Sequence, residues 1–300
     1  MRLLLVALLP ICPFVKYFVA RCGSLALLAL LAVSCAKTDP TPTAPTGPTR
    51  DDNLALGNPS GAVASTSSPT NYLLVKDQYT LSYNRDQGKP NWVSWHLSRA
   101  WEGSAARQDD FRADASLPSG WYEVKSSDYS GYGFDRGHHC PSADRNGSVA
   151  DNSATFLMSN MMPQAPNNNQ QTWANLEEYT RSLVDAGQEV YVICGSYGKG
   201  GTGSMGYQTT IAGGKVTVPA RCWKVVVVLP TGSNDVNRIT ANTRVIAVNT
   251  PNDNAVSSSW GNYRTSVDAI EAASGLDLLS ALPLSVQNMV EAKTDTGPTN

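Results

Sequence analysis

The segment FDRGHHCPSAD, residues 134–144, gathers side chains that can carry out acid–base chemistry. It holds two of the three histidines of the chain, His138 and His139, next to Asp135 and Arg136. A neutral imidazole, whose pKa is ordinarily about 6.5, is a suitable proton acceptor at neutral pH. Most histidine-containing loops are nevertheless plain solvated loops, so this segment alone does not establish a reaction centre.

A second group of polar side chains follows between residues 160 and 181. Asn169, Trp173, Glu177 and Arg181 recur every four positions, so in a helix they form one slowly drifting stripe. On spacing alone, Asn169 would be an ordinary helix cap, and Glu177 with Arg181 an exposed i,i+4 ion pair. From the residues alone, both these structural roles and a catalytic role stay open.

An imidazole, an amide, a carboxylate and a guanidinium together suit phosphodiester hydrolysis. That reaction needs a base to deprotonate water, a divalent cation to offset charge on the phosphoryl and leaving oxygens, and cationic donors. Mg²⁺ prefers oxygen ligands and keeps most of its waters, so one amide oxygen suffices as an anchor when a carboxylate holds the waters. The chain has no CxxC and no His/Cys pair at zinc spacing, so we expect no zinc site.

The elements that must position these groups can be read from the apolar patterns. Five segments rich in aromatic and β-branched residues predict strands of one twisted sheet: 72–84, 91–98, 190–198, 215–230 and 244–250. Residues 172–187 and 265–275 have helical spacing and end at glycine; Thr265 and Asp268 form a candidate capping pair for the second. The predicted class is α+β, with a central, mostly antiparallel twisted sheet flanked by helices.

The N-terminal segment predicts export. Residues 1–34 read as a signal peptide, because the apolar run from Leu25 to Val33 is too short to span a bilayer. Cys35 follows small residues as in a bacterial lipobox, so we expect acylation there and a cell-envelope protein anchored by lipid to a membrane, facing periplasm or exterior. A plain cleaved signal is the alternative, and the unusual apolar run before Lys16 suggests translation from near Val15.

Composition divides the remainder of the chain into three parts. Residues 35–70 are rich in Pro, Thr and Ser and predict a tether, residues 71–290 a folded domain, and residues 291–300 a flexible tail. The net charge of −2, with 16% charged residues, lacks the strong basic excess of proteins that reside on nucleic acid. Any site for a polyanion must therefore be local.

Three cysteines remain outside the N-terminal segment: Cys140, Cys194 and Cys222. An odd number leaves at least one thiol free. Cys194 and Cys222 lie on predicted strands and could form a disulfide if those strands are neighbours.

Three motifs together resemble those of the DNA/RNA non-specific endonuclease family. They are DRGH at 135–138, SNMMPQ at 159–164 and NQQTWANLE at 169–177, in the family's order and spacing. A looser resemblance extends from Tyr72 to Pro283. The resemblance to this family implies a ββα-metal finger at the site and endonucleolytic cleavage of DNA and RNA that leaves 5′-phosphate ends.

The resemblance also implies the central roles. His138 looks like the general base, Asn169 like the direct ligand of Mg²⁺ (or Mn²⁺), and Glu177 like the carboxylate that orients metal-bound water. A purely structural His138 would require the downstream motifs to be coincidence.

The other matched residues are expected around the phosphate. Asp135 would hold the histidine-bearing loop, Arg136 would lie near the phosphate, and Arg181 would help to hold the scissile phosphate. Asn160 and Gln164 resemble family residues that line the site.

One departure concerns the arginine that family members carry upstream, shortly before an aromatic residue. Here the segment is RQDDFRAD, with Asp109 and Asp110 directly before Phe111. Arg107 or Arg112 could serve, and we assign the substrate-binding role to Arg107.

Two other function classes stay open at this stage. The chain could be a non-catalytic surface lipoprotein that binds polyanions or a protein partner, although such a module needs no base, metal ligand and water-orienting carboxylate together. It could also hydrolyse small nucleotides, which a closed pocket would favour.

Overall fold

The computed structural model describes residues 47–300. The predicted signal peptide, the lipidation site Cys35 and the start near Val15 lie outside the described residues. Within residues 47–300, no helix combines the length and apolar character needed to cross a bilayer.

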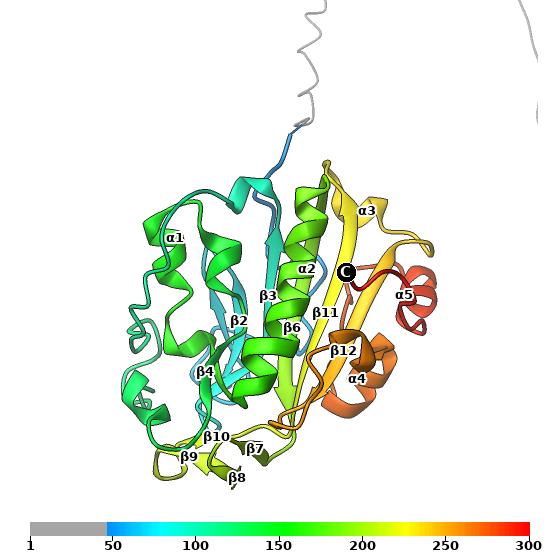
Figure 1. Ribbon diagram of the computed structural model, residues 1–300. Helices are drawn as coiled ribbons and strands as arrows, with labels where there is room; N and C mark the ends of the chain where they lie inside the picture. Colours follow the sequence, from blue (N-terminus) through cyan, green and yellow to red (C-terminus); the bar gives the residue numbers. More distant parts are fainter. Residues whose placement is uncertain (1–46) are drawn as a thin grey trace, which may run out of the picture. The chain divides into compact units, whose positions relative to one another are not determined.

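A seven-stranded antiparallel sheet forms the centre of the fold (Figure 1). Its strand order is β1-β2-β3-β6-β11-β12-β13. The bounds are β1 Tyr72–Val75, β2 Thr80–Asn84, β3 Lys89–Leu97, β6 Gln188–Tyr197, β11 Arg221–Pro230, β12 Arg244–Pro251 and β13 Arg264–Thr265. The predicted α+β class and its mostly antiparallel sheet are confirmed.

Alternate residues of the central strand β11 enter two different cores. Val226 packs in one apolar cluster with Leu176 of α2, whereas Val225 and Val227 pack in a second with Ile270 of α4. Successive side chains of a strand point to opposite faces, so helices cover both faces of the sheet (Figure 1). The helices are α1 Val149–Ala154, α2 Ala174–Asp185, α3 Asp235–Arg238, α4 Val267–Ser274 and α5 Leu284–Val290.

The folded unit begins before residue 71, so the predicted tether boundary is wrong. Leu56 and Ala62 are buried in the second core, and Trp92 Nε1 donates to Ser60 Oγ at 2.8 Å. Few apolar residues lie in this segment, but those few are placed to cover an existing sheet face, which composition cannot reveal.

The C-terminal tail is held as well, against the prediction of a flexible end. Arg244 donates to both carboxylate oxygens of Asp295 at 2.9 Å, and Arg264 Nη1 donates to Gly297 O.

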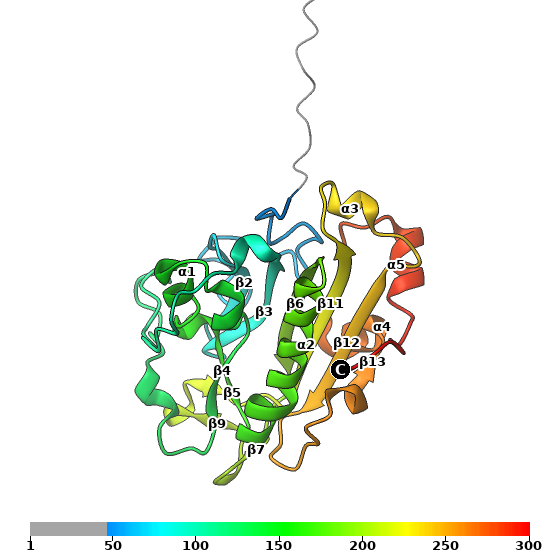
Figure 2. The same cartoon turned by 45° about the horizontal axis from the view of Figure 1, so that its top comes forward.

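Three two-stranded ribbons complete the fold (Figure 2). They pair β4 (Asp135–His138) with β5 (Met161–Gln164), β7 (Gly201–Gly203) with β8 (Gly206–Gln208), and β9 (Thr210–Ile211) with β10 (Val216–Thr217).

The three cysteines of the described chain are buried and free. Strands β6 and β11 are neighbours, as a disulfide would require, but their register sets Cys222 opposite Ser196 and Cys194 opposite Lys224. The two thiols therefore do not face each other, and the possible Cys194–Cys222 bridge is absent.

Candidate active site

The three motifs meet in one ββα unit formed by β4, β5 and the start of α2 (Figure 2). Gly137 of DRGH allows this pairing, because a Cβ on it would lie 2.3 Å from Gln164 Oε1. Residues Asn168–Trp173 form a π-helical turn that continues into α2. Such widened turns are frequent at functional sites, and this one carries Asn169.

His138 packs against two aromatic rings, each covered by an arginine. The imidazole centroid is 5.5 Å from that of Phe111 and 5.0 Å from that of Phe156. The Arg136 guanidinium lies 4.3 Å from the Phe111 centroid, and that of Arg107 lies 4.8 Å from the Phe156 centroid. Two cations therefore stand close to the imidazole without hydrogen-bonding to it.

This surrounding keeps His138 neutral. Burial, followed by the charges of Arg107, His139 and Arg136, lowers its pKa to about 3. Its Nε2 atom is buried and has no hydrogen-bond partner within residues 47–300. A neutral imidazole has one nitrogen without a hydrogen, and that nitrogen can accept a proton.

Asp135 fixes the orientation of the Asn169 amide. Asn169 Nδ2 donates to Asp135 Oδ2 at 2.9 Å, and Gln170 Nε2 donates to the same oxygen at 2.8 Å. With its nitrogen engaged, the Asn169 amide presents its Oδ1 in the opposite direction. An oriented amide oxygen is a hard ligand of the kind that Mg²⁺ accepts, so this donor set fits such an ion.

Glu177 and Arg181 do not pair with each other. Glu177 Oε1 accepts from Lys224 Nζ at 2.8 Å, and Arg181 Nη1 donates to Asp144 Oδ1 at 3.0 Å. Burial raises the pKa of Glu177, while the charge of Lys224 opposes that rise. The exposed i,i+4 ion pair that spacing alone would favour is thus excluded, and both side chains are held from neighbouring elements.

A pocket of about 420 Å³ connects several of the expected residues. Its lining includes Arg107, Asp135, Arg136 and Asn169. Arg181 instead lines a separate pocket of about 600 Å³ together with Arg99. Glu102, Glu178 and Asp185 line that pocket as well, and Arg99 pairs with two of these acids, so its lining carries no excess of positive charge.

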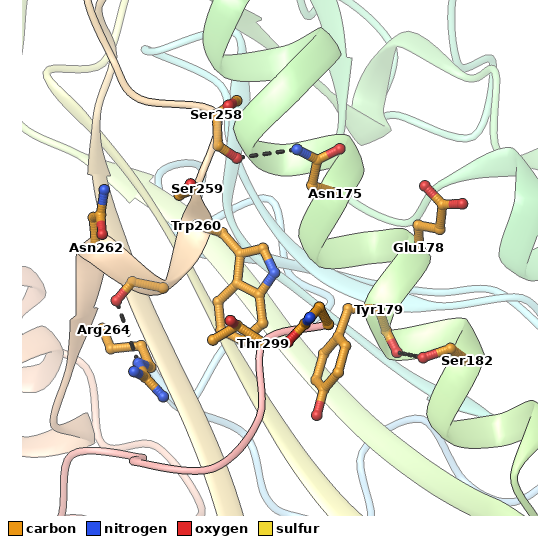
Figure 3. A pocket seen from close by; sticks show the side chains of 12 residues that line it. Asn175, Glu178, Tyr179, Ser182, Ser258, Ser259, Trp260, Asn262, Arg264 and Thr299 are labelled. Carbon is orange, nitrogen blue, oxygen red and sulfur yellow. Dashed lines mark hydrogen bonds between the residues drawn. The ribbon is translucent and has the colours of Figure 1, made fainter.

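A larger pocket of about 690 Å³ lies on another side of α2 (Figure 3). Trp260 and Tyr179 lie side by side there, with ring centroids 5.2 Å apart. Asn175 of the third motif lines it, but none of the candidate site residues named from the sequence does.

Asn160 and Gln164 are fully buried, and neither these two nor His138 and Glu177 are among the residues that line the pocket. Asn160 Nδ2 donates to the carbonyls of Cys140 and Thr155, and its Oδ1 accepts from Cys140 N at 3.0 Å. Gln164 packs against Gly137. Asn160 thus holds the finger through its hydrogen bonds, whereas both amide atoms of Gln164 are buried without a hydrogen-bond partner within residues 47–300.

The structure separates the two candidate upstream arginines. Arg107 lines the pocket, whereas Arg112 Nη1 donates to the Ser153 carbonyl and to Asp110, outside the pocket lining. Arg107 also pairs with Asp109, whose φ of 52° lies in the left-handed region. The assignment of this position to Arg107 therefore agrees with its placement.

Three contributors were not predicted from the sequence: Phe111, Phe156 and Lys224. The sequence could have indicated Lys224, since it is the only charged residue in the apolar run 222–229 and a buried lysine requires a partner. The two phenylalanines carried no such signal, because isolated aromatic residues are ordinary core material.

His139 is fully buried, and its Nδ1 lies 2.9 Å from the Asn160 carbonyl oxygen. Burial lowers its pKa from 6.5 to about 3, so the unfolded chain binds a proton there that the native chain does not. The associated stability is complete above about pH 6.5 and is lost as pH falls toward 3, by about 1.4 kcal/mol per pH unit. Urea unfolding at several pH values should give a shallower loss for His139→Gln; an unchanged slope would refute this assignment.

Comparisons with known proteins agree with this geometry. The family model for DNA/RNA non-specific endonucleases matches residues 56–285. A nuclease from Nostoc sp. (strain PCC 7120 / SAG 25.82 / UTEX 2576) is 51% identical over 243 residues, covering 81% of this chain and 86% of that protein. Human mitochondrial endonuclease G is 34% identical over 211 residues, 68% of each chain.

The fold has a counterpart among solved structures. A crystal structure of the EndoG/EndoGI complex, titled as a mechanism of EndoG inhibition, contains a chain that aligns with a TM-score of 0.62 at 23% identity. The alignment covers 77% of this chain and 91% of that chain, which supports the shared fold. The family match over residues 56–285 and the 51% identity to the Nostoc nuclease show that the chain belongs to the DNA/RNA non-specific endonuclease family.

Proposed function

We propose that the chain is a Mg²⁺-dependent endonuclease that hydrolyses DNA and RNA to products with 5′-phosphate ends, with His138 as general base. The observation that carries the proposal is the neutral imidazole of His138, with Nε2 unpartnered, packed against Phe111 of the pocket that Arg107, Arg136 and Asn169 also line. Mn²⁺ would suit the same oxygen ligands. Contacts to phosphate carry no sequence information, which agrees with a non-specific enzyme.

Each residue has a distinct task in this proposal. His138 accepts a proton from the attacking water at the ring nitrogen that carries no hydrogen. Arg107 and Arg136, at the pocket, donate to the phosphoryl oxygens as negative charge develops. Asn169 would hold the divalent ion through Oδ1 and Glu177 would orient its waters. A bound ion would supply positive charge against the leaving oxygen.

Cleavage of supercoiled plasmid and of single-stranded RNA, with Mg²⁺ or with EDTA, tests the proposal. We expect Mg²⁺-dependent cleavage of both polymers and loss of cleavage in EDTA. A folded chain that binds polyanions but cuts neither polymer would favour the non-catalytic lipoprotein. Hydrolysis of a small phosphodiester without cleavage of either polymer would favour a phosphodiesterase of small nucleotides.

Arg107→Ala is expected to lower kcat/KM on plasmid DNA by about 10²-fold, the scale of losing one donor to the transition state. Arg112→Ala is the matched control, because this arginine lies in the same segment outside the pocket lining. Steady-state rates and melting temperatures of both variants provide the measurement. Equal losses in the two variants would contradict the assignment of Arg107.

Lys224→Met is expected to destabilise the protein by about 3 kcal/mol, because it leaves the carboxylate of Glu177 without its cation. The pKa of Glu177 should rise further, since the opposing charge is removed. Urea unfolding of Lys224→Met, Glu177→Gln and the double variant measures the coupling between the two residues. If the double variant is no more stable than Lys224→Met, the pair is not the origin of the effect.

Export and acylation at Cys35 form a separate part of the proposal and rest on the sequence pattern alone. Membrane fractionation and intact-mass analysis of the wild type and Cys35→Ser test them. A soluble, unmodified wild-type protein would leave a plain cleaved signal as the alternative.

A further inference from the structure

Three carboxylates converge where the two C-terminal helices meet, away from the proposed catalytic site. Asp268 and Glu271 lie one turn apart on α4, and Glu291 directly follows α5. An oxygen from each of the three lies within 4.8 Å of the others. The backbone joins the same two elements, because Asp268 N donates to Glu291 O at 3.2 Å.

Of the three carboxylates in this group, that of Glu291 has the least favourable surroundings for its ionised form. Glu291 is only 6% exposed, and its Oε1 is buried without a hydrogen-bond partner in the described chain. Burial raises its pKa to about 8, and the other contributions, from Glu271, Asp268 and Asp277, are all acidic and act in the same direction. Glu271 offers one free oxygen, since its Oε1 accepts from Leu278 N at 2.5 Å.

A buried carboxylate among acidic neighbours requires either a proton or a cation. The donors here are all carboxylate oxygens from two elements, and the exposed Asp268 leaves room for water ligands. Such a set suits Ca²⁺, which accepts six to eight oxygen ligands in flexible geometry, better than Mg²⁺, which requires a near-ideal octahedron. We propose that Asp268, Glu271 and Glu291 form a Ca²⁺ site that fastens α5 to α4.

A second group of side chains, formed by Asp51, His96, Glu189 and Asp235, also brings its ligand atoms close together. Glu189 and Asp235 are already paired with Arg238, and Asp51 N donates to His96 Nδ1 at 3.3 Å. The proton of a neutral His96 then resides on Nε2, so this nitrogen is not free for a metal. That group has its own internal cation and donor, whereas the charges that act on Glu291 are all negative.

The site would stabilise the C-terminal segment without taking part in catalysis. The chain runs from Glu291 to Asp295, which binds Arg244 of β12. A cation at Glu291 would therefore anchor the segment at its start, as Arg244 does further along.

The test is thermal unfolding of metal-stripped full-length protein in EDTA and in about 10 mM CaCl₂, together with Ca²⁺ titration calorimetry. Asn169→Ala serves as the background, so that an ion at the proposed catalytic site does not contribute. We expect Ca²⁺ to raise Tm by about 3 °C or more, as for an extracellular site of modest affinity. MgCl₂ at equal ionic strength should give a smaller shift.

Glu291→Gln in the same background should raise Tm in EDTA at neutral pH, because it removes an acid that must take up a proton on folding, and should abolish the response to Ca²⁺. Glu123→Gln, an exposed acid elsewhere, is the matched control and should retain the response. Absence of a Ca²⁺ response, or its persistence in Glu291→Gln, would overturn the proposal whether or not the protein proves to be a nuclease.

Discussion

His138→Ala is expected to lower kcat on plasmid DNA and on RNA by about 10²- to 10⁴-fold, the range that positioned proton transfer contributes. KM should change little, because the arginines and amide of the pocket remain in place. Initial rates across substrate concentrations separate the two constants, and the melting temperature verifies folding. A loss in kcat below about tenfold would remove His138 from the role of base.

The pH dependence of kcat/KM tests the role of His138 as well. A pKa of about 3 keeps His138 neutral throughout the neutral range, so the acid limb of kcat/KM should show no inflection near 6.5. Because the Arg107 charge helps to lower this pKa, the residual activity of Arg107→Ala should decline at a higher pH than that of the wild type. An acid limb at the same pH in both proteins would assign the titration to another group.

The sheet and the two main helices were predictable because each signal was local, whereas the ββα finger was expected from the family resemblance. Apolar runs mark β6, β11 and β12, and helical spacing that ends at glycine marks α2 and α4. The predicted N-cap of α4, Thr265, was wrong by one residue. The cap is Ser266, whose hydroxyl accepts from Ala269 N. Both residues suit a cap, and only the path of the preceding strand selects between them.

Burial of polar side chains could not be predicted, since it depends on contacts between distant segments. Asn160 looks like a residue that lines the site until its amide is seen bonded to Cys140 and Thr155. The partners of Glu177 and Arg181 come from β11 and from residue Asp144, not from their own helix. For the same reason, the packing of residues 50–70 was missed: the surface that they cover exists only after the sheet has formed.

Asn169→Ala is expected to lower the Mg²⁺-dependent rate by at least about 10²-fold and to shift the Mg²⁺ concentration for half-maximal activity upward. The reason is geometric: Asp135 holds the amide nitrogen at 2.9 Å, so the oxygen is oriented before any ion arrives. Asn175→Ala is the matched control, because that amide donates to the Ser258 carbonyl outside the active-site pocket (Figure 3).

Asn169→Asp separates orientation from charge at the same position. The new carboxylate supplies an oxygen with greater charge, but it loses the hydrogen bond to Asp135 and repels that carboxylate. If orientation governs ion binding, Asn169→Asp will stay well below the wild type at low Mg²⁺ and recover partly at high Mg²⁺. If Asn169→Asp binds the ion as tightly as the wild type, the contact between Asp135 and Asn169 serves only the fold, and Asp135→Asn should then leave the rate unchanged.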